Sequence, residues 1–172
     1  MRIVVFLISI FLLFGSVYVE RIKENKADEI IVLKSKRKIQ LFYKKQKVKQ
    51  YSISLGGNPI GHKQFEGDEK TPEGSYFIDG KNPNSKYYKN LGISYPNAED
   101  KAFARSKGRN PGAAIKIHGL PNDKPWLGKL HLLKDWTHGC IAVTNKQMDE
   151  IYSSVKIGTK ITILPWCVFK SL

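Results

Sequence analysis

From residue 29 onward, short runs of β-branched and aromatic residues alternate with clusters of glycine, proline and asparagine. Runs of this length with partial apolar–polar alternation predict strands rather than helices. We expect strands at 31–33, 39–43, 48–55, 75–79, 91–96, 114–118 and 160–164, a hairpin connection at 44–47, and turns at 56–61 and 82–85. The pattern therefore predicts a mainly β domain, a sandwich or barrel-like sheet with one or two short helices.

One helix is clearly signalled near the C-terminal end of this domain. Thr144 and Gln147 have the spacing of a capping box, in which each side chain satisfies a backbone N–H of the other residue. Apolar residues follow at helical spacing: Met148, Ile151, Tyr152 and Val155. Gly158 is placed to end this helix. The polar segment 100–112 fits either a loop or a second short helix.

The N-terminus differs in composition from the rest of the chain. Residues 3–19 include no charged side chain and follow Arg2. This apolar length is close to the lower limit of ~17–25 residues for a membrane-spanning helix, and slightly exceeds the apolar core of a cleaved signal peptide. No Ala-x-Ala-like cleavage site follows, which favours an uncleaved anchor. The positive charge before the run predicts that the remainder of the chain is translocated.

These features divide the chain into three parts. We expect an N-terminal hydrophobic helix within 1–22 that acts as a signal anchor or signal peptide, a linker at 23–28, and an exported domain at 29–168. The expected location is the periplasmic or extracytoplasmic face of the inner membrane, with residues 3–19 as the membrane partner. About 145 residues remain after the anchor, enough to bury roughly two-thirds of the unfolded surface in one core.

The net charge of +14 is large, and many of the basic residues lie between 34 and 49. Such a cluster fits an anionic polymer or membrane surface as partner, or a solvated strand edge protected by lysines. Nucleic acid is not expected as a partner, because the chain contains no nucleic-acid motif and export removes it from most nucleic acid. The two cysteines, Cys140 and Cys167, are too few for a disulfide framework. Cys167 lies in an apolar context that favours packing.

Residues with reactive side chains concentrate in one segment. His118, His131, His138 and Cys140 all lie within 23 consecutive positions. A thiol with an ordinary pKa of about 8.5 is mostly protonated at neutral pH, and a nearby imidazolium or helix N-terminus lowers that pKa. Nucleophilic catalysis therefore fits this segment. Simple packing of the cysteine and a metal site made by the same four residues are the alternatives, although their spacing matches no familiar zinc pattern.

Gly139 directly precedes the cysteine and allows a sharp turn with close approach of a substrate. Backbone N–H groups around Gly139 and Cys140 could hold a tetrahedral oxyanion. A histidine within hydrogen-bond reach, itself oriented by a third group, would complete such a site.

The segment Thr137-His-Gly-Cys140, preceded by His118-Gly119, resembles the signature of the L,D-transpeptidase (YkuD-type) catalytic domain. Further segments resemble that family in the same order: 53–57, 61–63, 67–68, 71–74 and 117–119. Together they span about residues 29–165. The resemblance implies an L,D-transpeptidase-like β-sandwich or barrel.

The resemblance also implies roles for individual residues. Cys140 would be the nucleophile, and His118 the base, oriented by the backbone carbonyl of Gly119. His138 would be a second imidazole beside the thiolate, and Gly139 would help to shape the oxyanion site.

Other residues are expected to have roles outside the chemical step. Asp135, Trp136 and Thr137 would line the substrate site. His62 and His131 are expected to be bystanders. Many family members carry arginine where this chain has Ala142, and this difference affects substrate specificity more than the nucleophile.

The activity implied by the resemblance is acyl transfer on peptidoglycan stem peptides. Cys140 would release D-Ala from a tetrapeptide donor, and an amine acceptor would resolve the thioester; with water as acceptor, the enzyme would be an L,D-carboxypeptidase or a crosslink-cleaving hydrolase. No cofactor and no metal are expected, because the thiolate performs the chemistry. The alternative outside enzymology is a basic module that binds the cell wall.

Overall fold

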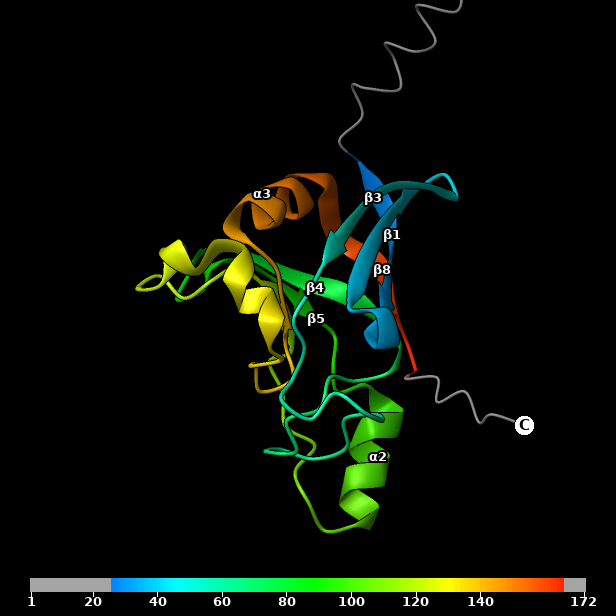
Figure 1. The fold of residues 1–172 in the computed structure, drawn as a ribbon. Helices are drawn as coiled ribbons and strands as arrows, with labels where there is room; N and C mark the ends of the chain where they lie inside the picture. The colour runs from blue at the N-terminus through cyan, green and yellow to red at the C-terminus, as the bar shows by residue number, and fades with distance from the viewer. Residues whose placement is uncertain (1–25, 166–172) are drawn as a thin grey trace, which may run out of the picture.

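The computed structural model describes residues 26–165 of the chain. The elements in chain order are β1 (Ala27–Leu33), η1 (Lys34–Lys36), β2 (Lys38–Tyr43), β3 (Gln46–Ser52), β4 (Gly74–Ser85), β5 (Tyr88–Ile93), α2 (Ala98–Ser106), β6 (Lys116–His118), η2 (Pro125–Leu133), β7 (Ile141–Ala142), α3 (Asn145–Ser154) and β8 (Val155–Leu164). Within this part of the chain the strands form one eight-stranded sheet in the order β3-β2-β1-β8-β4-β5-β6-β7 (Figure 1). The expected mainly β fold with few short helices is confirmed.

The sheet mixes antiparallel and parallel pairs. β1, β2 and β3 form an antiparallel meander, and β1 pairs in parallel with β8 at the centre of the sheet. β8 pairs antiparallel with β4, β4 pairs antiparallel with β5, and β5 pairs antiparallel with β6. At the far edge β6 and β7 run parallel, with Ile117 opposite Ile141 and His118 opposite Ala142.

The two edges of this sheet meet. Ser54, just after β3, exchanges two backbone hydrogen bonds with Ala142 in β7, at 3.0 and 2.9 Å. Two residues further on, Gly56 pairs with Thr137, and the N–H of Gly57 donates to the carbonyl of Thr137 at 3.0 Å. Of the two expected architectures, the structure therefore shows the barrel-like one, a single sheet that curls back on itself.

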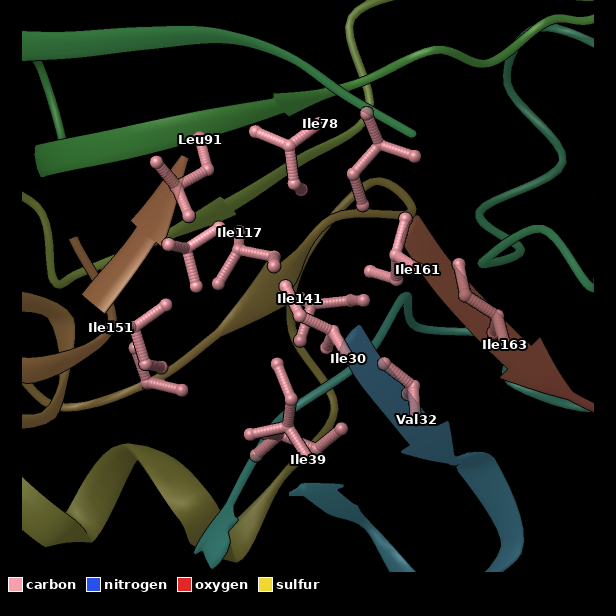
Figure 2. Close-up of a cluster of buried hydrophobic side chains, with 14 of the residues drawn as sticks. Ile30, Val32, Ile39, Ile78, Leu91, Ile117, Ile141, Ile151, Ile161 and Ile163 are labelled. Carbon is pink, nitrogen blue, oxygen red and sulfur yellow. The ribbon is translucent and has the colours of Figure 1, made fainter. Parts of the chain in front are cut away.

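The concave face of the sheet encloses the hydrophobic core. Alternate residues of β1 and β2 point inward, as period-two patterning requires; in β1, Ile30 and Val32 are fully buried. Side chains from eight elements meet in one cluster, shown in Figure 2: Ile30, Val32, Ile39, Ile78, Leu91, Ile117, Ile141, Ile151, Ile161 and Ile163. Ile117 directly precedes His118 in β6, and Ile141 directly follows Cys140 at the start of β7. Burial of these two isoleucines in the core therefore fixes the positions of His118 and Cys140.

The predicted helix is present as α3, and its capping box is confirmed. The hydroxyl of Thr144 accepts from the N–H of Gln147, and the Gln147 side chain accepts from the N–H of Thr144. The predicted end at Gly158 is wrong, because Val155 is already extended and begins β8. The polar segment 100–112, left open between loop and helix, is helical up to Ser106: it holds most of α2 (Ala98–Ser106), which Asn97 caps, and the rest is not helical.

Two further sequence predictions need correction. Residues 82–85, predicted to form a turn, are the last residues of β4, and Asn82 pairs with Asn90 of β5. The chain reverses direction between Ser85 and Tyr88. No sequence pattern predicted η2, which contains Gly128 with a positive φ of 47°.

The basic stretch between 34 and 49 is not a uniform surface. Lys34 is fully buried, and its ammonium group donates to the carbonyls of Gly61 and Thr71 and pairs with Glu73 at 2.8 Å. Lys49 pairs with Glu150 of α3. Part of the stretch therefore holds the fold together.

The expected N-terminal hydrophobic helix and Cys167 lie outside the described residues. Between residues 26 and 165, no helix has the length and apolarity needed to cross a bilayer.

We expect Gly56→Ala to destabilise the protein where the sheet closes. A Cβ on Gly56 would lie 2.0 Å from the carbonyl oxygen of Glu69 and 3.0 Å from the Cα of Gly139, so backbone would have to move. Overpacking of this kind costs about 1–3 kcal/mol of unfolding free energy. Chemical denaturation followed by circular dichroism measures the change.

Gly80→Ala is the matched control, since a Cβ there meets no atom within 4 Å. Equal stability of both variants would show that the close approach at Gly56 is not required.

Candidate active site

His118 ends β6 and is 5% exposed. Its Nδ1–H donates to the carbonyl oxygen of Gly119 at 2.7 Å. A carbonyl can only accept, so Nδ1 bears the proton, and Nε2 of the neutral ring has a free lone pair. The rings of Tyr87 and Trp136 hold the imidazole in place, at centroid distances of 4.6 and 5.8 Å.

The environment keeps this imidazole neutral. Burial lowers the pKa of His118 to about 4, while the hydrogen bond to Gly119 acts in the opposite direction. The charges of His131 and Lys116 lower this pKa further. His118 is therefore a base with an unprotonated Nε2 throughout the physiological pH range.

Cys140 follows a tight turn that only glycine can make. Gly139 has a φ of +121°, and a Cβ there would lie 2.6 Å from the carbonyl oxygen of Lys70. The Thr137 hydroxyl bridges the turn, accepting from the Gly139 N–H at 3.1 Å and donating to the Cys140 carbonyl at 2.7 Å. The N–H of Thr137 donates to Leu55, so the turn is attached to the segment that closes the sheet.

The thiol of Cys140 is protonated at rest. Burial is the main influence and raises the pKa of Cys140, while the backbone N–H and the charge of Lys116 act against it. The sulfur lies 3.7 Å from the carbonyl oxygen of Ala114. We expected a lowered thiol pKa from the sequence; the structure corrects this, because desolvation outweighs the favourable local groups.

Oxyanion binding at this turn also differs from the expectation. The N–H of Gly139 is already bonded to the Thr137 hydroxyl, so Gly139 shapes the turn rather than providing a free donor. Within residues 26–165, the N–H of Cys140 itself has no hydrogen-bond acceptor. This N–H is the donor that the turn offers to an oxyanion.

Cys140 and His118 line the same cavity, which has a volume of about 920 Å³. Pockets for small ligands commonly have volumes of about 300–1,000 Å³. The walls come from β4, β5 and their connection, β6, η2 and the turn that bears Cys140: Asn82, Asn84, Ser85, Lys86, Tyr87, Asn90, Ala114, Lys116, His118, Pro121, Lys124, Leu127, Leu130, His131, Lys134, Trp136, Thr137, His138 and Cys140.

Asp135 and His138 lie elsewhere than the sequence predicts. Asp135 does not line the cavity; its carboxylate accepts from the guanidinium of Arg37 at 2.7 Å and from the N–H of Leu55 at 2.9 Å. It therefore supports the turn from outside. His138 is at the rim with a side chain that is 91% exposed, and its Nδ1 is 3.5 Å from Glu69.

The sequence missed other residues at the cavity. His131, expected to be a bystander, is buried in the cavity wall, and its Nδ1 is 3.4 Å from both the Trp136 indole N–H and the Ser54 hydroxyl. Tyr87 had no local signal at all. His62, in contrast, lies away from the cavity and links Asp100 with the backbone of Glu73.

Comparison with known proteins agrees with this architecture. The family model of the YkuD L,D-transpeptidase catalytic domain matches residues 27–163. The Escherichia coli (strain K12) protein YafK is 34% identical over 132 residues, which are 73% of this chain and 46% of YafK.

Solved structures show the same likeness. The helical cell shape determining protein Pgp2 from Campylobacter jejuni superposes with a TM-score of 0.63 at 26% identity, covering 86% of this chain and 53% of Pgp2. Bd1075 of Bdellovibrio bacteriovorus superposes with a TM-score of 0.56 at 26% identity, covering 81% of this chain and 48% of Bd1075. The chain thus spans about half the length of these relatives.

The family model covers nearly all of the described residues, and its match includes both His118 and Cys140. The chain belongs to the YkuD family of L,D-transpeptidase catalytic domains.

Proposed function

We propose that this protein is a cysteine acyltransferase that acts on peptidoglycan stem peptides. The observation that supports this most strongly is that His118, at the end of β6, and Cys140, directly before the neighbouring parallel strand β7, line one cavity. The hydrogen bond from Nδ1–H to Gly119 leaves Nε2 of His118 as the basic nitrogen of the ring. Membership of the YkuD family supports peptidoglycan as the substrate. Export, with residues 3–19 as a membrane anchor, belongs to the same proposal.

The first half-reaction forms a thioester. The sulfur of Cys140 attacks the carbonyl carbon between the L-centre of the diamino acid and the terminal D-Ala, and Nε2 of His118 takes the thiol proton. The N–H of Cys140 stabilises the tetrahedral oxyanion. When the intermediate collapses, the carbon–nitrogen bond breaks, His118 gives its proton to the departing amine, and D-Ala leaves.

The second half-reaction returns the free enzyme. An acceptor amine attacks the thioester carbonyl, His118 removes a proton from that amine, and the thiol of Cys140 departs with the proton from His118. An amine of another stem, a free D-amino acid or a protein lysine would serve as acceptor. With water as acceptor, the same residues make the protein an L,D-carboxypeptidase or crosslink-cleaving hydrolase.

A neutral thiol–imidazole pair suits this sequence of steps. Burial disfavours an ion pair at rest, so proton transfer accompanies attack instead of preceding it. The Gly119 carbonyl, bonded to Nδ1–H, stabilises the imidazolium that forms transiently.

We expect a carbapenem probe, which acylates thiols, to label the wild-type protein at one site. Cys140→Ala should abolish the labelling, because it removes the nucleophile and leaves the cavity otherwise intact. Intact-protein mass spectrometry measures the adduct. Equal labelling of both proteins would favour the alternative of a basic wall-binding module without catalysis.

The pH dependence of turnover should reflect the buried base. An ordinary histidine loses its function as a base below about pH 6.5. Since the pKa of His118 is lowered to about 4, the acid limb of kcat/KM should lie near pH 4, with activity retained at pH 5–6. Initial rates across pH 3.5–8 test this, and an acid limb near pH 6.5 would contradict the neutral buried state.

A further inference from the structure

The cavity walls have an unusual charge. Lys86, Lys116, Lys124 and Lys134 line the cavity, and none of its lining residues is aspartate or glutamate. Asparagine amides at three further positions add donors without negative charge. A concave site with charges of one sign concentrates ligands of the opposite sign.

These lysines are not neutralised by neighbouring carboxylates. Four lysines elsewhere in the described part of the chain are paired with carboxylates: Lys34 with Glu73, Lys49 with Glu150, Lys63 with Asp68, and Lys89 with Asp149. None of the four cavity lysines forms an ion pair between residues 26 and 165.

Two carboxylates next to cavity-lining residues have partners of their own. Glu69 is 3.5 Å from His138, and Asp135 is bonded to Arg37. The positive charge of the cavity is therefore available to a ligand.

Lys116 is the cavity lysine that shares a strand with His118. It precedes His118 by two positions on β6, so both side chains are on the same face of the strand. It is partly buried, whereas the other three are exposed. It lines the same cavity as His118 and Cys140, and its positive charge lowers the pKa of both.

We propose that the cavity selects its donor by free carboxylates: Lys116 binds a carboxylate next to the scissile amide, and Lys86, Lys124 and Lys134 attract the others. This inference rests on the proposed function and specifies its substrate class. A stem peptide with free carboxyl groups is a good donor, and one with those groups converted to carboxamides is a poor donor.

The physical basis is the difference between a carboxylate and its amide. The two groups have nearly the same size, but only the carboxylate has the charge that Lys116 attracts. A charge-assisted hydrogen bond is roughly twice as strong as a neutral one. In a partly buried position this difference amounts to roughly a tenfold preference for each paired carboxylate.

The test uses a set of synthetic tetrapeptide donors: one with all carboxyl groups free, and others with the terminal, the diamino-acid or the glutamyl carboxyl converted to a carboxamide. D-Ala or D-alaninamide release gives kcat/KM for each. Wild-type enzyme should prefer the free donor roughly tenfold over at least one amidated donor. The amidated donor with the largest decrease in kcat/KM identifies the carboxylate that Lys116 binds.

Variants assign the preference to particular residues. Lys116→Gln should bring the ratio of kcat/KM for free and amidated donors close to one, and Lys116→Arg should restore it. Because a ratio between donors is measured, a general loss of activity from misfolding or from a changed thiol does not imitate the result. Lys101→Gln, an exposed residue of α2 well separated from η2 in Figure 1, is the matched control and should keep the wild-type ratio.

Two results would overturn the inference while leaving the proposed function intact. One is a ratio near one for every donor in the wild type. The other is an unchanged ratio in both Lys116→Gln and the combined Lys86→Gln, Lys124→Gln and Lys134→Gln variant. Absence of Cys140-dependent turnover of every donor would instead contradict the proposed function itself.

Discussion

Closure of the sheet between Ser54 and Ala142 is the constraint on which the site depends. Two backbone hydrogen bonds join the edges there, and the segment that follows Ser54 then runs alongside the turn that bears Cys140. β7 is only two residues long and is held between this segment and β6. Without the closure, β7 would have only β6 as a neighbouring strand, and the turn with Cys140 would lose its backbone contacts with the segment after β3. The approach is so close that residue 56 must be glycine, which links the barrel geometry directly to the position of the thiol.

The same burial that fixes the reactive groups also determines their charge. His118 and Cys140 are both desolvated, and desolvation favours the neutral form of each. The hydrogen bond from Nδ1–H to Gly119 selects the tautomer in which Nε2 is the base. The lysines that line the cavity add positive charge around this neutral pair. In the proposed reaction, this charge would attract an anionic donor, and proton transfer would begin only when the substrate binds.

Local patterns allowed part of the structure to be predicted from the sequence. The capping box of Thr144 and Gln147 involves neighbouring residues only, and it gave the start of α3 correctly. The predicted end of that helix is wrong because Val155 pairs with Ala27 of β1 and so belongs to the sheet. The central pair, His118 and Cys140, was found through its resemblance to a family signature rather than through local propensity.

The remaining features depend on contacts between distant parts of the chain. Asp135 supports the turn through Arg37, a residue 98 positions earlier, which no local pattern reveals. Tyr87 and His131 reach the cavity from a strand connection and from η2, whose positions the fold determines. The raised pKa of Cys140 was missed for the same reason, since burial exists only after folding.

The central claim is that folding brings the base His118 and the nucleophile Cys140 together for acyl transfer. The most direct measurement is to mix the protein with a tetrapeptide donor in the absence of an added amine, quench with acid, and determine the intact mass together with released D-Ala. The account predicts a covalent adduct equal in mass to the donor minus D-Ala, located on Cys140 by fragmentation, with one D-Ala released per adduct at early times. Release of D-Ala that persists in Cys140→Ala, or an adduct on another residue, would contradict it.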